Sequence, residues 1–109
     1  MIATTYRKGP NMAGYAATVA PHAYKVLFEN EQVRLLEVSM EPGSHTEMHS
    51  HPDNLVYILS EGKYAFTDAS GEKAEFDVSP GAVFWMEATD HATDNVGDTT
   101  IRALMFEPK

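Results

Sequence analysis

From Tyr24 onward, the chain consists of short segments in which apolar and polar residues alternate. In the longest segment, 32–41, Leu36, Val38 and Met40 fall on the same face. A period of two is typical of β-strands, because successive side chains of a strand point to opposite faces. Proline, glycine and other turn residues separate the segments. The pattern predicts strands over 24–28, 32–41, 45–51, 54–60, 63–68, 72–78, 82–86, 99–106 and a short segment after position 91 that ends at 96.

Eight or nine closely spaced strands with almost no helical period predict an all-β sandwich or jelly roll. The stretch 68–71, Asp-Ala-Ser-Gly, predicts a tight hairpin between two of the strands. A length of 109 residues suits one domain with one core. Residues 1–22 show no clear period, so we expect a lead-in arm there, which could pack on a partner subunit. We expect a single barrel domain over 23–109.

Several bulky side chains within the predicted strands are candidates for the core. Large apolar side chains are usually buried, because burial removes much apolar surface from water. One or two of them could instead line a pocket. The set expected to be mostly in the core is Tyr57, Phe66, Phe84, Trp85 and Met86.

Charge and composition narrow the class of partner. The chain has 8 basic and 16 acidic residues, a net charge of −8, which argues against nucleic acid and anionic membranes as partners. It contains no apolar run long enough to predict a transmembrane helix. Cysteine is absent, which excludes disulfides and thiolate metal ligands and fits a cytoplasmic protein. Nitrogen and oxygen atoms must therefore hold any metal ion.

The most informative polar residues are three histidines. His49 and His51 are separated by one residue, so in a strand both imidazoles lie on the same face, with backbones roughly 6–7 Å apart. Two such imidazoles can bind one ion, and His91 from another segment would complete a site with three nitrogen ligands. Three neutral imidazoles bind divalent first-row metals well and leave positions open for a substrate. The alternative is that one or more of them are ordinary polar residues at a barrel mouth.

The spacing around the first two histidines resembles the first motif of the cupin family. The motif has a glycine, five residues, His-x-His, three or four residues, a glutamate, six residues and a second glycine. The frame is kept, but Leu55 stands where the family has its glutamate ligand. The residues that match are Gly43, His49, His51 and Gly62.

A second motif of the family is similar to a more degenerate part of this chain. Gly81, Glu87, His91 and Asn95 follow its order, with Glu87 in the place of a proline. The resemblance covers residues 25–107 and is closest to the small single-domain bacterial cupins. It implies a double-stranded β-helix, the cupin jelly-roll barrel, that is often a homodimer and holds a divalent metal ion inside the barrel mouth.

The missing glutamate changes the expected site. An ion with three neutral ligands keeps more of its charge, so it is a stronger Lewis acid that favours anionic, chelating ligands. Leu55 should keep water away from its side of the pocket. Glu47 or His45 could replace the glutamate, since both share the strand parity of His49, and Asp53 is a further candidate. Iron, manganese, zinc and nickel all suit such a site.

Glu87 and Glu47 are the candidate catalytic residues. Glu87, four residues before His91, could orient that imidazole or act as a base, and the alternative is a solvated loop carboxylate. Asn95 is expected to hold a loop or a strand end rather than to touch substrate.

These residues lead us to expect a metal-dependent enzyme that acts on a small organic molecule. With iron(II), the site suits oxidative cleavage of a carbon–carbon bond in a diketone-like acid. With zinc, manganese or nickel, it suits isomerase, lyase or ring-opening chemistry, in which the metal polarises a carbonyl and a base moves a proton. Two alternatives are a non-catalytic cupin that binds a small ligand and a structural cupin with a degenerate site.

Overall fold

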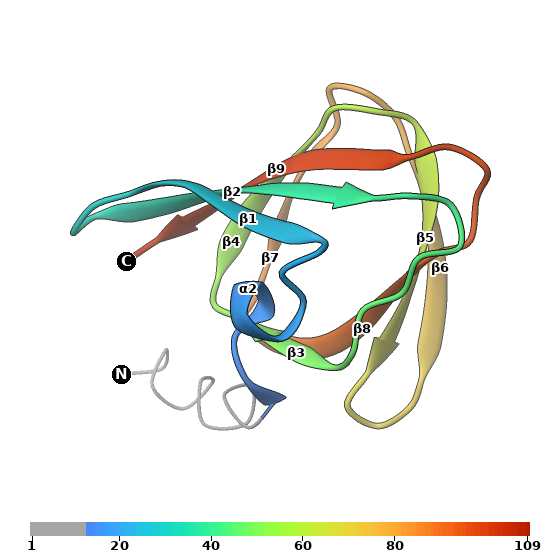
Figure 1. Ribbon diagram of the computed structural model, residues 1–109, viewed down its shortest axis with the longest axis horizontal. Helices are drawn as coiled ribbons and strands as arrows, with labels where there is room; N and C mark the ends of the chain where they lie inside the picture. The colour runs from blue at the N-terminus through green and yellow to red at the C-terminus, as the bar shows by residue number, and fades with distance from the viewer. Residues whose placement is uncertain (1–12) are drawn as a thin grey trace.

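The computed structural model describes residues 13–109, and residues 1–12 lie outside the described part. The described chain forms two antiparallel sheets that curve around a common interior (Figure 1). The larger sheet has the strand order β1-β2-β9-β4-β7, and the smaller has the order β3-β8-β5-β6. The strands are β1 (Tyr24–Glu29), β2 (Val33–Met40), β3 (His49–His51), β4 (Asn54–Ile58), β5 (Gly62–Asp68), β6 (Lys73–Val78), β7 (Val83–Met86), β8 (Thr89–Asn95) and β9 (Ile101–Pro108). The prediction of an all-β jelly roll is confirmed.

The inward faces of β2 and β9 form the centre of the core. Leu36, Val38 and Met40 are buried, as their alternation in the sequence predicts. Their register partners on β9 are also buried: Met105, Ala103 and Ile101. Because directly paired residues share a face, the two strands present one continuous apolar layer to the interior.

The prediction for the bulky side chains is wrong for Tyr57 and Trp85, which are 45% and 52% exposed. β4 turns its first, third and fifth residues inward, so Tyr57 faces outward. Trp85 lies on the outward face of β7, because it is the register partner of an outward residue of β4. Phe66 and Phe84 pack against the core, and Met86 lines the barrel interior. The outer face of the larger sheet is therefore also partly apolar.

The described part of the predicted lead-in lies on the barrel of its own chain. Tyr15 forms a β-bridge with Ser50 in β3, whose amide donates a hydrogen bond to the carbonyl of Gly14. A single helical turn, α2 (Ala16–Val19), follows, and its first residue is fully buried. The segment thus packs on the strand that carries two of the histidines. Within residues 13–109, no helix has the length and apolar character needed to cross a membrane.

Neighbouring aliphatic residues at the end of β4 test this account of the core. Ile58 is fully buried and Leu59 is 41% exposed. We expect Ile58→Ala to lower the free energy of unfolding by about 2–5 kcal/mol, because it leaves a cavity in the core. Leu59→Ala should lower it by less than about 1 kcal/mol, because solvent already covers much of the side chain. Urea denaturation followed by circular dichroism measures both values, and equal losses would contradict the burial assigned to these positions.

Candidate metal centre

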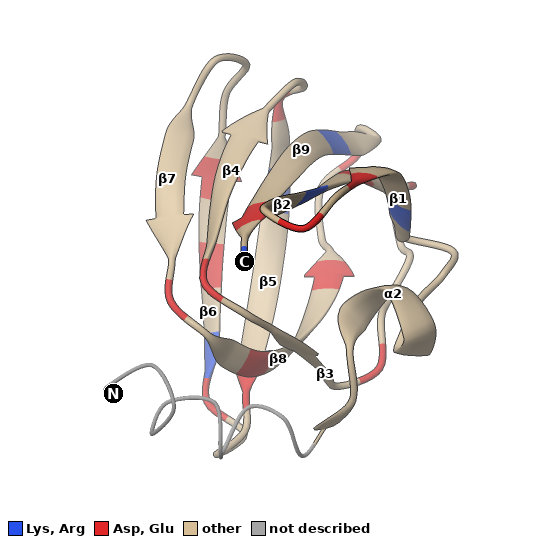
Figure 2. Ribbon diagram, turned by 90° about the vertical axis from the view of Figure 1, so that its left-hand side faces the viewer, with Lys and Arg blue, Asp and Glu red and all other residues tan. Residues whose placement is uncertain are grey.

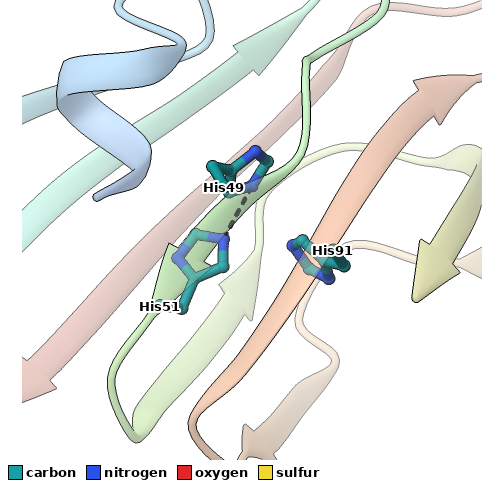
Figure 3. A group of neighbouring side chains, drawn as sticks. All are labelled: His49, His51 and His91. Atoms are coloured by element: carbon teal, nitrogen blue, oxygen red, sulfur yellow. Dashed lines mark hydrogen bonds between the residues drawn. The ribbon is translucent and has the colours of Figure 1, made fainter. Parts of the chain in front are cut away.

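The smaller sheet brings the three histidines together. His49 and His51 occupy the two ends of β3, and His91 lies on the neighbouring strand β8 (Figure 3). β3 and β8 are antiparallel, and His49 is the direct register partner of His91. The side chains are buried, with exposed fractions of 0%, 1% and 5% in sequence order. The three residues predicted as metal ligands therefore form one cluster inside the barrel.

The geometry of the cluster is close to threefold. The ring centroids are 4.7–4.9 Å apart, and the ring planes cross at 80–88°. One nitrogen of each ring lies within 4.8 Å of the other two, and the Nε2 atoms of His49 and His51 are 3.0 Å apart. Two nitrogens bound at right angles to one ion, each at about 2.1 Å, would also be about 3.0 Å apart. The spacing fits two adjacent ligands of a single divalent ion.

Hydrogen bonds fix which nitrogen of His49 faces the centre. Its Nδ1 lies 2.7 Å from the carbonyl of Glu47, so Nδ1 carries the proton and donates. Nε2 of a neutral His49 is then a lone pair directed at the cluster. Nε2 of His91 is also buried and has no hydrogen-bond partner among residues 13–109. Buried nitrogens that carry no proton or have no hydrogen-bond partner, gathered in one cluster, fit the donor set of a divalent first-row metal ion.

Burial keeps the three imidazoles neutral. Desolvation lowers the pKa of His49, and the hydrogen bond to the Glu47 carbonyl opposes it only in part. Desolvation, with repulsion from the other two rings, lowers the pKa of His51 well below its usual range. For His91, desolvation and the nearby His49 lower the pKa to about 3. At neutral pH, protons therefore do not compete with a metal ion for these nitrogens.

The sequence model of the cupin domain matches residues 36–107, which include most strands of both sheets and all three histidines. The chain belongs to the cupin family. No curated protein is significantly similar to it.

Solved structures agree with this assignment. A cupin domain from Bordetella pertussis Tohama I is 25% identical, has a TM-score of 0.72, and the match covers 79% of this chain and 91% of that one. A Klebsiella pneumoniae protein with a double-stranded β-helix domain is 17% identical, with a TM-score of 0.61 and coverage of 78% and 75%. The polyketide cyclase RemF from Streptomyces resistomycificus is 22% identical, with a TM-score of 0.59 and coverage of 78% and 63%. The last two likenesses concern the fold alone.

In this cupin, Leu55, which stands where the family has its glutamate, does not shield the site from water. Leu55 is 38% exposed and faces outward, so the prediction that it dries the pocket is wrong. The reason is the phase of β4, which begins at Asn54 and turns Asn54 and Val56 inward. Asn54 is fully buried, and its Oδ1 has no hydrogen-bond partner among residues 13–109. The sequence reasoning missed Asn54, and only its parity with Val56 and Ile58 could have indicated it.

The carboxylate of Glu47 lies outside the barrel. Its side chain is 82% exposed, and an oxygen is 3.7 Å from Nε2 of His45. Nδ1 of His45 is 2.8 Å from Asp94, so neither predicted substitute joins the three histidines. β3 begins only at His49, and the parity that placed residues 45 and 47 on its face does not extend to them. Glu47 instead orients His49 through its backbone carbonyl.

Glu87, unlike Glu47, lies in the same cavity as one of the three histidines. It is exposed in the connection between β7 and β8, and it lines an open cavity of about 650 Å³ together with His91, Phe66 and Met86. Of the three histidines, only His91 lines this cavity, which lies on the side of β5 and β6. The placement is compatible with either predicted role of Glu87, and its action as a base stays a prediction.

Two other polar residues hold loops. Oδ1 of Asp53 accepts a hydrogen bond from the amide of Ala88 at 2.8 Å, which ties the start of β4 to the connection before β8. The side-chain amide of Asn95 donates hydrogen bonds to the carbonyls of Met40 and Thr99 at 2.9 and 2.8 Å. The prediction that Asn95 holds a strand end is confirmed. Neither side chain joins the three-histidine group.

Removing single histidines tests the ligand set. We expect His49→Ala, His51→Ala and His91→Ala each to weaken binding of Zn²⁺ or Co²⁺ by about two orders of magnitude or more, because each removes one of three protein ligands. Equilibrium dialysis of tag-free, chelator-stripped protein, followed by elemental analysis, measures the affinity. His45→Ala is the matched control, since this ring is exposed and pairs with Asp94. Full metal retention by His91→Ala would contradict the assignment.

Proposed function

We propose that this cupin is a metal-dependent enzyme that acts on a small, chelating organic anion. The observation that carries the proposal is the convergence of three buried, neutral imidazoles without a carboxylate among them. Neutral ligands leave a divalent ion with its full charge, and this favours anionic oxygen ligands in the open coordination positions. Bound iron(II) would supply dioxygen chemistry, whereas zinc, manganese or nickel would supply Lewis-acid chemistry.

The surroundings of the centre support a small substrate that enters from the mouth. The interior space beside His91 is only about 20 Å³, so aromatic and methionine side chains fill the barrel below the site. The open cavity beside His91 is lined by Phe66 and Met86 and by the cation of Lys73. Asp68, Glu72 and Glu87 line it as well, so the preference for an anion rests on the neutral ligand set of the centre and not on the charge of the cavity wall.

Oxidative cleavage of a diketone-like acid is the first candidate reaction, because it needs no protein base beside the centre. Glu47 lies in solvent and Asp53 is engaged with Ala88, so neither supports proton transfer at the substrate. Proton transfer in an isomerase or lyase is the second candidate. It is favoured by Glu87, which lines the same cavity as His91, whereas Glu47 and Asp53 do not.

Two assays separate these reactions. For cleavage, we expect iron(II)-loaded protein to consume dioxygen with acetylacetone, with His51→Ala inactive and Glu87→Gln changed by less than about threefold. For proton transfer, we expect zinc- or manganese-loaded protein to exchange the methyl protons of pyruvate in D₂O, measured by NMR. Glu87→Gln should then slow exchange by about 10²-fold or more. Metal-loaded protein that binds small chelating anions but is inactive in both assays would favour a non-catalytic binding protein, and one that binds no metal would favour a degenerate site.

A further inference from the structure

Tyr24 is the buried first residue of a strand that is otherwise exposed. The other five residues of β1 are exposed, whereas Tyr24 is only 4% exposed. Its ring meets the imidazoles of His49 and His51 edge-on, with centroids 5.1 and 5.2 Å away. Its hydroxyl is 3.2 Å from Nε2 of His49. The strand thus directs one phenol into the three-histidine centre.

A metal ion would change the hydrogen bonding of this phenol. Because Nδ1 of His49 donates to a carbonyl, Nε2 is an acceptor, and the hydroxyl of Tyr24 donates to it. A metal ion uses that same lone pair, so the hydroxyl loses its acceptor when the centre is loaded. A phenol is protonated at neutral pH, so its buried hydroxyl must then find another acceptor.

One acceptor lies within the described surroundings of Tyr24, and a bound molecule would supply another. The first is the buried Oγ1 of Thr93, which lies near the Tyr24 hydroxyl and lines the same narrow space as Tyr24 and His91. The other is an oxygen of a molecule bound in an open position of the centre. An anionic oxygen is the stronger acceptor, because hydrogen bonds to charged groups are roughly twice as strong as neutral ones.

We propose that Tyr24 is a ligand-positioning residue whose hydroxyl donates a hydrogen bond to an anionic oxygen of the small molecule held at the three-histidine centre. The proposal rests on the proposed function, because it needs a chelating anion at that centre. It adds a specificity element: an enolate, hydroxamate or carboxylate oxygen would be held by both the ion and the phenol. Tyr24 thereby orients the bound molecule at the centre.

The test is a binding measurement without turnover. Co²⁺-loaded protein is titrated with acetohydroxamate under nitrogen, and the visible absorption of the ion reports binding. We expect Tyr24→Phe to keep one Co²⁺ per chain and to weaken acetohydroxamate binding about tenfold, as expected for one hydrogen bond to an anion. Tyr64→Phe is the matched control, because Tyr64 is also buried and lines the same narrow space. It should change the affinity by less than about twofold.

Equal affinity in Tyr24→Phe and the unaltered chain would overturn the role of Tyr24 and leave the proposed function intact. If the unaltered chain binds Co²⁺ but not acetohydroxamate, both proposals fail. A crystal structure of the unaltered chain with Zn²⁺ and acetohydroxamate is a second readout that needs no variant. A Tyr24 hydroxyl within hydrogen-bond distance of the probe supports the proposal, and one turned to Thr93 overturns it.

An independent observation concerns the outer face of the larger sheet. Five apolar residues form one row across all five strands, each the register partner of the next. A second row of three, on β9, β4 and β7, lies beside it. We call these two rows the outer apolar face. Its residues are Phe28, Leu35, Phe106, Leu55 and Trp85 in the first row, and Leu104, Tyr57 and Val83 in the second.

The outer apolar face is large enough for a stable contact between two chains. Six of its eight side chains are 38–54% exposed. With about 150–250 Å² for each aromatic side chain, this exposure amounts to roughly 500–600 Å² of apolar surface. A standard interface buries about 800 Å² per partner, of which about 450–520 Å² is apolar. The face therefore matches what one side of such an interface supplies.

The distribution of charge favours a second copy of this chain as the occupant. The chain carries a net charge of −8, so two copies repel each other over most of their surfaces. β4 and β7 contain no charged residue, and Figure 2 shows both strands without red or blue. Contact through these two strands therefore brings no acidic group of either strand together. We infer that two copies pair through the outer apolar face, around a twofold axis near Tyr57 and Trp85.

Light scattering during size-exclusion chromatography tests this pairing. We expect the unaltered chain to elute with twice the mass of one chain at about 50 µM, and Tyr57→Glu to elute as a monomer. Phe76→Glu is the matched control, because Phe76 is 46% exposed on β6 of the other sheet. It should leave the dimer unchanged. A monomer at every concentration, or a dimer that only Phe76→Glu disrupts, would overturn the inference.

Fluorescence gives a second readout that needs no variant. Trp85 is the single tryptophan of the chain and lies on the outer apolar face. We expect its emission to move to shorter wavelength as the unaltered chain is concentrated through the dimerisation range, because pairing removes the indole from water. An emission maximum that stays constant while the mass doubles would place the contact elsewhere and overturn the inference.

Discussion

The register between β3 and β8 is the constraint on which the rest of this structure depends. It places His49 directly opposite His91 and leaves His51 on the same inward face. A slip of one residue in this pairing would turn the imidazoles of β3 away from the interior. β3 has only three residues, so its own ladder is short. Ser50 reinforces it, since its amide donates to Gly14 and its hydroxyl donates to Asp90 on β8.

Burying three imidazoles in one place is unfavourable unless their nitrogens are satisfied. Desolvation and mutual repulsion keep the rings neutral, and Nε2 of His91 lacks a hydrogen-bond partner among residues 13–109. An ion at the centre would offset the free energy lost by desolvating these nitrogens, because coordination satisfies several lone pairs at once. Without an ion, aliphatic side chains at these three positions would stabilise the barrel more than the imidazoles do.

The two faces of the larger sheet carry different kinds of side chain. Its inner face carries the aliphatic layer that closes the barrel around the centre, and its outer face carries aromatic residues that water only partly covers. The proposed ligand site and the proposed pairing surface are thus separated by one layer of backbone. Because a strand alternates its faces, a substitution on the outer face can change association without touching the histidines.

Local patterns in the sequence determined the strands, the aliphatic layer on β2, the role of Asn95 as a strand-end clamp, and the three histidines. Each of these depends on the alternation of a strand or on a short spacing, which the chain carries without its fold. Tertiary structure alone decided the phase of each strand, that is, which of its residues point inward, and that β3 begins only at His49. That phase turned Leu55 and Tyr57 outward and left Glu47 before β3 in solvent. It also decided that Tyr24, from a distant strand, reaches His49, because contacts between segments depend on the path of the whole chain and not on spacing within one segment.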